Sequence, residues 1–229
     1  MRMNVRAKFP GWFRCGFLPA LILCWALALV PAARGAGQNI VVLGDSLAAG
    51  YGVDPSEAFP ALLQKKIEAA GWNDTVINAG VSGDTTADGL ARTGWLLRQK
   101  IDVLILELGG NDGLRGFPVA TTRTNLQAII DRVRQKYPQV RVVLAGMQMP
   151  PNLGVEYTGA FRQIYPDLAT VNHAALIPFL LAGVGGREEL NQADHIHPTA
   201  AGHKIVADNV WDVLRPVLAG MHGDHRPGP

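Results

Sequence analysis

The chain has 229 residues, 48% of them hydrophobic and 17% charged, a composition that indicates a globular domain with a sizeable core and excludes a disordered chain. Its formal net charge is +2, from 21 basic and 19 acidic residues. Five of the basic residues and none of the acidic ones lie in residues 1–35. Without that segment the net charge is about −3, and nucleic-acid binding has no electrostatic support.

Residues 1–35 have the pattern of a secretory signal peptide. A basic head without acidic residues precedes an apolar stretch from Gly16 to Val30, and small residues follow it. The apolar stretch is too short for a comfortable membrane span. We therefore expect cleavage, a periplasmic or secreted mature protein, and no stable membrane insertion afterwards, with an uncleaved anchor as the alternative. Both cysteines, Cys15 and Cys24, lie in this segment, so the mature chain has neither thiol chemistry nor disulfides.

From residue 39 onward, predicted strands and helices alternate. Apolar runs predict strands at 39–43, 75–78, 102–108, 140–146 and 174–177. Helical periodicity predicts helices at 57–70, 85–99, 119–136, 157–172 and 199–218. Near-continuous apolar strands that alternate with helices are typical of an α/β fold, a three-layer α/β/α sandwich around a five-stranded parallel sheet. Residues 36–220 are expected to form this one domain, and residues 221–229 a disordered tail.

Ser46 is a candidate nucleophile. It follows the first predicted strand and opens a predicted helix in Gly44-Asp45-Ser46-Leu47. A serine in this place is either a nucleophile served by a base or the N-cap of the helix, and this segment alone does not separate the two. Ser82, in Gly80-Val81-Ser82-Gly83, is a rival, but Asp84 stands where the nucleophile-elbow motif requires glycine. Partners later in the chain favour Ser46.

Gly83 and Asn111 follow the second and third predicted strands. Ligands bind at the carboxyl ends of parallel strands, so the motifs that contain these two residues and Ser46 are expected to share one site. The Gly83 backbone N–H and the Asn111 side-chain amide are candidate donors to an oxyanion, and an ordinary turn and an Asx turn are their structural alternatives. Glu107 and Asp112, which flank Asn111, are expected to be structural or rim residues.

A candidate acid–base pair lies near the C-terminus in Asp194-His195-Ile196-His197. A tight turn can bring the Asp194 carboxylate to the His197 imidazole, although either histidine could be the base. His195, His197 and His203 are also candidate metal ligands. His203, however, lies in a predicted helix and has no acidic partner at metal spacing. We therefore expect neither a metal nor a cofactor.

These motifs, in this order, resemble those of the SGNH (GDSL-type) hydrolases, and more narrowly the periplasmic arylesterase, acyl-CoA thioesterase I and lysophospholipase group. The matching segments are residues 43–51, 82–85, 107–116 and Asp194-x-x-His197-Pro198. The resemblance extends from about residue 38 to about residue 218. It implies a flavodoxin-like sheet, an acyl-serine intermediate and no metal.

The resemblance also implies a role for each signature residue. Ser46 is the nucleophile, and its own backbone N–H, the Gly83 backbone and the Asn111 side chain form the oxyanion hole. The spacing in the family selects His197 over His195 as the base, and Asp194 orients it. His195 departs from the pattern, because close relatives often have glycine there, and we expect it to line the mouth of the pocket.

Substrate contacts and substrate class are expected as follows. The resemblance implies that residues 113–117 border an acyl groove, so Leu114 and Phe117 are expected to contact the acyl chain, and Met149 to belong to another wall. The expected protein is a monomeric serine hydrolase of small-molecule aryl or alkyl esters, thioesters or lysophospholipids. A carbohydrate O-deacetylase and a non-catalytic binding protein on the same fold are the alternatives.

Overall fold

The computed structural model describes residues 37–223, which contain a five-stranded parallel sheet with strand order β2-β1-β3-β4-β5. The strands are β1 (Asn39–Gly44), β2 (Thr75–Gly80), β3 (Val103–Glu107), β4 (Arg141–Ala145) and β5 (Ala175–Ile177). The strand order reverses at β1: β2 lies on one side of β1, and β3 lies on the other. Such a switch point leaves a crevice at the carboxyl ends of the strands, where ligands bind in open α/β sheets.

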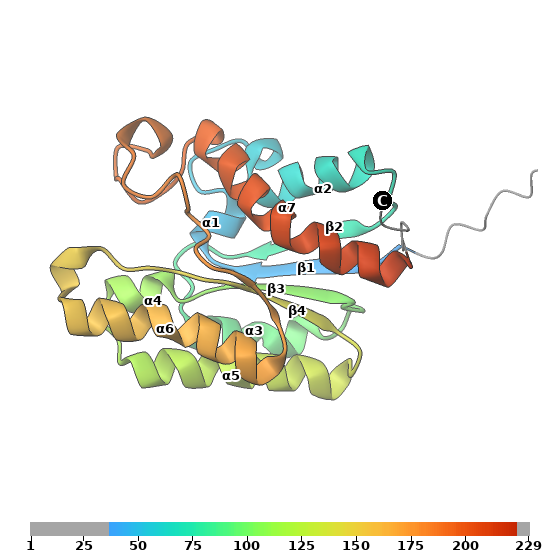
Figure 1. The fold of residues 1–229 in the computed structure, drawn as a ribbon, viewed down its shortest axis with the longest axis horizontal. Helices are drawn as coiled ribbons and strands as arrows, with labels where there is room; N and C mark the ends of the chain where they lie inside the picture. The colour runs from blue at the N-terminus through green and yellow to red at the C-terminus, as the bar shows by residue number, and fades with distance from the viewer. Residues whose placement is uncertain (1–36, 224–229) are drawn as a thin grey trace, which may run out of the picture. The chain divides into compact units, whose positions relative to one another are not determined.

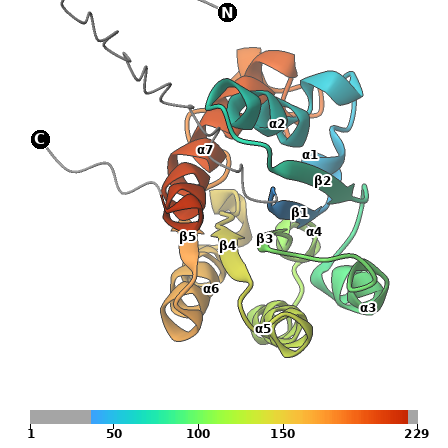
Figure 2. The ribbon, with the colours of Figure 1, turned by 90° about the vertical axis from the view of Figure 1, so that its right-hand side faces the viewer.

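Helices cover both faces of the sheet, as Figure 2 shows: α2 and α7 lie on one face, and α3, α5 and α6 on the other. The long helices are α2 (Phe59–Ala69), α3 (Thr86–Leu96), α5 (Val119–Lys136), α6 (Val155–Asn172) and α7 (Ala200–His222). Short helices follow the strands: α1 (Ser46–Ala49), η1 (Pro55–Glu57), α4 (Gly110–Leu114), η2 (Pro151–Leu153) and η3 (Glu188–Leu190). The predicted α/β/α fold class is therefore confirmed.

The central strands form the core. Every residue of β3 is buried, and so is every residue of β1 after Asn39. The edge strand β2 is more open, because it has a neighbour on one side only. Capping side chains mark the start of two flanking helices. Thr85 and Asp88 form a reciprocal capping box at the start of α3, and the Thr199 hydroxyl caps α7. These features fix where each strand ends and therefore where the site forms.

The last helix extends slightly past residue 220, the predicted end of the domain. Helix α7 continues to His222, whose Nε2 lies 2.8 Å from Asp74 Oδ2 and whose ring lies against Trp72. These contacts hold the last turn of α7 to the domain. The rest of the predicted tail, residues 224–229, and the predicted signal peptide, residues 1–35, lie outside the described residues. Between residues 37 and 223, no helix is both long and apolar enough to cross a membrane.

Candidate active site

The motifs predicted from the sequence meet at the carboxyl ends of the strands, at the left of Figure 1. Ser46 is the first residue of α1, and the Asp45 side chain caps this helix by accepting the Leu47 backbone N–H at 3.0 Å. Asp45, and not Ser46, is thus the N-cap. The alternative role considered for Ser46 is taken by its neighbour, and the Ser46 hydroxyl is left for other partners.

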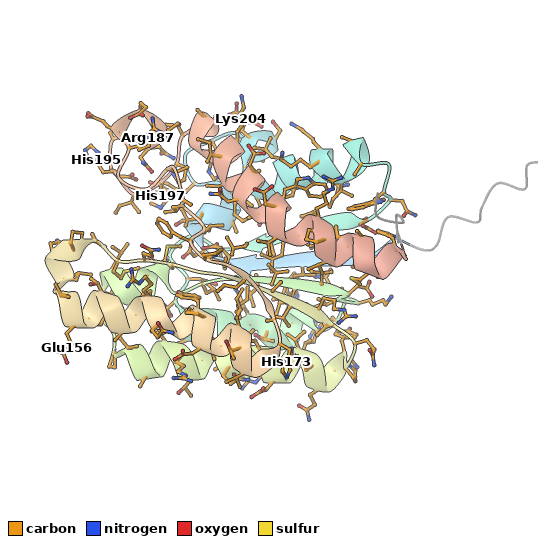
Figure 3. The ribbon with its side chains drawn as sticks, viewed as in Figure 1. Glu156, His173, Arg187, His195, His197 and Lys204 are labelled. Carbon is orange, nitrogen blue, oxygen red and sulfur yellow. The ribbon has the colours of Figure 1, made fainter. Side chains whose placement is uncertain are left out.

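One of these partners is His197, which lies 151 residues further along the chain. His197 Nε2 lies 2.9 Å from Ser46 Oγ, and His197 Nδ1 lies 2.6 Å from Asp194 Oδ2. Figure 3 labels His197 and His195 on the loop before α7. The arrangement has the nucleophile, base and acid spacing of a catalytic triad. It also selects His197 over His195 as the histidine next to the serine.

The acid–base turn is built by a single carboxylate. Asp194 Oδ1 accepts the backbone N–H groups of Ile196 and His197, each at 3.0 Å, while Oδ2 faces the imidazole. These hydrogen bonds, with the one from the His197 backbone contributing most, lower the pKa of Asp194 to about 2. Asp194 therefore stays ionised at neutral pH.

Gly83 lies on the loop after β2, and Asn111 lies in α4, the short helix that follows β3. Gly83 has φ +88°, a conformation that suits glycine, and its carbonyl accepts a hydrogen bond from Arg115 Nη2 at 3.2 Å. Asn111 Nδ2 donates to the Asp84 carbonyl at 3.0 Å and lies 3.3 Å from Asp45 Oδ2. The Asn111 amide thus joins the turn that contains Gly83 to the segment that carries the serine.

Buried acids lie beneath these groups. Glu107, Asp45 and Asp112 are 0%, 2% and 1% exposed, so of the two roles expected for Glu107 and Asp112 the structural one fits their burial. Asp112 accepts the Thr86 backbone N–H and hydroxyl at the start of α3. Glu107 Oε2 accepts the Asp45 N–H at 3.1 Å. Burial raises the pKa of Glu107 well above its usual value and that of Asp45 to about 6.

A partly buried ion pair that the sequence reasoning missed connects the end of β1 with the loop after β2. Arg92 Nε lies 2.6 Å from Asp84 Oδ2, and Arg92 Nη2 donates to the Gly44 carbonyl at 2.9 Å. The arginine on α3 thereby holds the end of β1 next to the loop after β2. Its side chain lies on a helix that shows ordinary amphipathic periodicity, so no local signal could have identified it.

A cavity of about 450 Å³ adjoins the serine and is mostly apolar. Of the predicted substrate contacts, Leu114, Met149 and His195 line it, whereas Phe117 does not. Phe117 is 38% exposed, and its carbonyl accepts the Tyr157 hydroxyl at 2.8 Å. The walls also contain residues that were not predicted to contact the substrate, namely Gln148, Phe179, Leu181, Gly185, Gly186, Asn191 and Ile196.

His195 has φ +59°, in the left-handed region that favours glycine. This backbone conformation explains why a glycine suits the position, and the His195 side chain projects from it to line the cavity. Within residues 37–223, no group of three His, Cys, Asp or Glu side chains is arranged to hold a metal ion. A separate cavity of about 520 Å³, lined by Arg134, Arg141 and His173 among others, includes none of the predicted site residues.

The chain is similar to known proteins over most of its length. Residues 42–205 match the sequence profile of the GDSL-like lipase/acylhydrolase family, and the chain belongs to that family. The chain is 43% identical to the esterase TesA of Pseudomonas aeruginosa over 201 residues, 87% of this chain and 99% of that protein. It is 38% identical to thioesterase 1/protease 1/lysophospholipase L1 of Escherichia coli K12, over 84% of this chain and 90% of that protein.

Solved structures agree with the sequence relatives. The crystal structure of TesA superposes with a TM-score of 0.75 at 43% identity, covering 79% of this chain and 99% of that chain. That of AlinE4, an SGNH-hydrolase family esterase, gives a TM-score of 0.67 at 43% identity, covering 80% of this chain and 98% of that chain. The predicted family and fold are thus confirmed, and the chain is an SGNH-type hydrolase.

Proposed function

We propose that this protein is an exported serine esterase in which Ser46, His197 and Asp194 form the catalytic triad. The observation that carries the proposal is the continuous chain of hydrogen bonds from Asp194 Oδ2 through the imidazole to Ser46 Oγ, at 2.6 and 2.9 Å. A hydroxyl becomes an effective nucleophile when such an oriented base accepts its proton. A binding protein on the same fold has no need for all three groups.

The reaction has two halves. Ser46 Oγ attacks the ester carbonyl carbon and gives its proton to His197 Nε2, and the carbonyl oxygen becomes an oxyanion. Collapse of this intermediate breaks the bond to the leaving alcohol or thiol, which takes the proton from His197 and leaves an acyl-serine. Water then loses a proton to His197 and attacks the acyl carbon. The carboxylic acid departs, and Ser46 regains its proton.

Three donors are proposed for the oxyanion: the Ser46 and Gly83 backbone N–H groups and the Asn111 side chain. The Asn111 amide carries two hydrogens, and its contact with the Asp84 carbonyl at 3.0 Å is shorter than the contact with Asp45 Oδ2 at 3.3 Å. The contact with the Asp84 carbonyl can hold the amide in place, while the other amide hydrogen turns to the oxyanion. Loss of one such donor costs on the order of 10²–10³ in kcat.

The cavity supports an apolar acyl group, since Leu114, Met147, Met149, Phe179 and Leu181 line it. We therefore favour acyl esters or thioesters over acetylated carbohydrate, for which a polar open cleft is expected. By their names, the relatives include an esterase, an arylesterase and a thioesterase/lysophospholipase. We also propose that residues 1–35 are removed on export and that the mature protein is a monomer in the periplasm or the medium.

The test is hydrolysis of p-nitrophenyl esters from acetyl to palmitoyl by the mature protein, with Ser46→Ala and Ser82→Ala beside it. We expect Ser46→Ala to fall to background, while Ser82→Ala, the matched serine on the next loop, keeps its activity. Loss in Ser82→Ala alone would reassign the nucleophile. Activity confined to the acetyl ester would favour the O-deacetylase, and no activity in any variant would favour a binding protein.

A further inference from the structure

The distance between Ser46 and His197 depends on two segments far apart in the chain, the segment after β1 and the acid–base turn before α7. A catalytic hydrogen bond is productive only when its groups are held within a fraction of an ångström. The Asp194 carboxylate organises the turn internally, and within residues 37–223 its hydrogen bonds all lie inside that turn. Other contacts must therefore set the position of the turn relative to Ser46.

Gln192 provides one such contact. Its side-chain Nε2 donates to the Tyr51 carbonyl at 2.7 Å and to the Pro198 carbonyl at 3.1 Å. Its backbone N–H donates to the His197 carbonyl at 2.8 Å. Gln192 thus forms hydrogen bonds with both segments. It donates to the loop five residues after the serine, and it donates to His197 and to the proline that follows His197.

The loop after α1 is shaped to receive this side chain. Gly52 has φ +77°, and a Cβ atom at that position would lie 2.1 Å from Gln192 Oε1 and 2.7 Å from its Nε2. Any side chain at residue 52 would displace the amide. The close seating indicates that the contact between Gln192 and this loop is a built feature of the fold rather than a chance approach of two surface groups.

The second contact is aromatic. The ring centroid of Tyr51 lies 4.6 Å from that of His197, with the two planes inclined at 43°. Tyr51 is 52% exposed, so it is not held there by the core. An aromatic face within about 6 Å of a cation attracts it. His197 becomes a cation during each half of the proposed reaction, and the Tyr51 ring is then beside the charge.

We propose that Tyr51 and Gln192 are positioning residues for His197: Gln192 fixes the Tyr51 loop to the acid–base turn, and the Tyr51 ring both supports the imidazole and stabilises its protonated form. The inference rests on the proposed function, because it needs His197 as the base. It adds to the triad a third support for the imidazole, supplied from the serine side of the site.

Other charged groups also face His197, and the test has to separate Tyr51 from them. Asp194 lies on its own turn, Asp45 lies beneath Ser46, and His203 lies on α7. Among the described residues, the hydrogen bonds that hold Asp45, Asp194 and His203 do not involve the Tyr51 ring, so the three keep their places in a Tyr51 variant. A change that follows replacement of the ring is therefore assigned to Tyr51.

The experiment compares Tyr51→Leu with Tyr51→Phe in the p-nitrophenyl ester assay from pH 5 to pH 9. Tyr51→Leu removes the aromatic face, and we expect kcat to fall about two- to fivefold with little change in KM. The acidic limb of the kcat/KM profile should move to lower pH by about half a unit, because the imidazolium loses a favourable contact. Tyr51→Phe keeps the ring and should restore both the rate and the limb.

Gln192→Ala tests the other half of the pair. We expect kcat to fall about tenfold with KM within about twofold, because the base is displaced while the acyl cavity is unchanged. The loss of kcat in the double variant Gln192→Ala/Tyr51→Leu should not exceed the product of the two single losses. Its kcat should lie close to that of Gln192→Ala alone, because Gln192 acts partly through the Tyr51 loop. Trp95→Leu, which replaces an exposed aromatic residue at the far end of α3, is the matched control and should behave as wild type.

The proposal is overturned if Tyr51→Leu and Gln192→Ala both match wild type in kcat and in the position of the acidic limb. It is also overturned if Tyr51→Phe is as slow as Tyr51→Leu, because the ring would then not be the active feature. Ser46→Ala, measured in the same series, separates this failure from failure of the proposed function: retained activity in Ser46→Ala refutes the function itself, whatever the Tyr51 variants do.

Discussion

Replacement of Glu107 by glutamine should make the protein less sensitive to alkaline pH. Glu107 is fully buried, and among the described residues its Oε1 has no hydrogen-bond partner. Burial, and secondarily the nearby Asp45 carboxylate, raise the pKa of Glu107 well above its usual value of 4.5. We therefore expect Glu107 to keep its proton in the folded protein over a pH range in which the unfolded chain releases it.

The magnitude follows from proton linkage. Above pH 4.5 the folded state binds one proton more than the unfolded state at this residue, so the free energy of unfolding falls as pH rises toward the raised pKa of Glu107. For a single proton the slope approaches about 1.4 kcal/mol per pH unit. A glutamine keeps an oxygen for the Asp45 N–H and has no proton to lose. The stability of Glu107→Gln relative to wild type should therefore increase with pH at up to this slope.

Urea unfolding at pH 5, 6, 7 and 8 measures this difference directly. The matched control is Glu156→Gln, which neutralises an exposed acid in the first turn of α6 and should show no such trend. Glu107→Leu, which leaves the Asp45 N–H buried without an acceptor, should be destabilised at every pH by about 1–3 kcal/mol. A pH-independent difference between Glu107→Gln and wild type would refute the protonated carboxyl.

Three further predictions concern single positions. Gly44→Ala should destabilise the fold by about 1–3 kcal/mol in chemical unfolding, because its Cβ would lie 2.3 Å from Glu107 Oε2; wild-type stability would contradict this packing. His195→Gly should raise the free energy of unfolding by up to about 1 kcal/mol, because a left-handed conformation costs a non-glycine residue about 1–2 kcal/mol. The greater entropy of glycine in the unfolded chain offsets part of this gain. A loss of stability would show that the histidine side chain supports the loop. Burial, and secondarily the nearby His197, lower the pKa of His203 to about 4. The wild-type protein should therefore lose up to about 3 kcal/mol of stability as pH falls from about 6.5 to about 4. His203→Gln should lose less over that interval. Equal acid sensitivity of the two proteins in urea titrations would count against a neutral buried His203.

The parts of the fold that could be predicted are those with a local signal. The apolar run of β3 and the capping residues of α3 each specify an element without reference to the rest of the chain. The proposed triad was accessible for the same reason, since Asp194 and His197 lie on one turn and Ser46 comes two residues after the end of a strand. Knowing that parallel strands end at one edge then suffices to bring these motifs together.

The remaining parts depend on side chains that meet only after folding. Arg92 joins two loops from a helix whose sequence pattern is ordinary, and Gln192 reaches a carbonyl 141 residues away. Phe179 and Leu181 become cavity walls through the path of the chain after β5. The sequence left open whether Glu107 is a structural or a rim residue, because only the packed sheet shows that its side chain is buried.

The turn that contains Asp194 has a consequence for the way its variants are interpreted. The same carboxylate that faces the imidazole also accepts two backbone N–H groups, and those bonds give the turn its shape. In a triad whose acid comes from a distant strand, replacing the acid changes the electrostatics of the base and leaves its backbone in place. Here a replacement of Asp194 that lacks a side-chain acceptor changes both together, so its slow rate does not measure the value of the charge. That value has to be obtained from a replacement such as Asp194→Asn, which keeps an oxygen for the two backbone N–H groups.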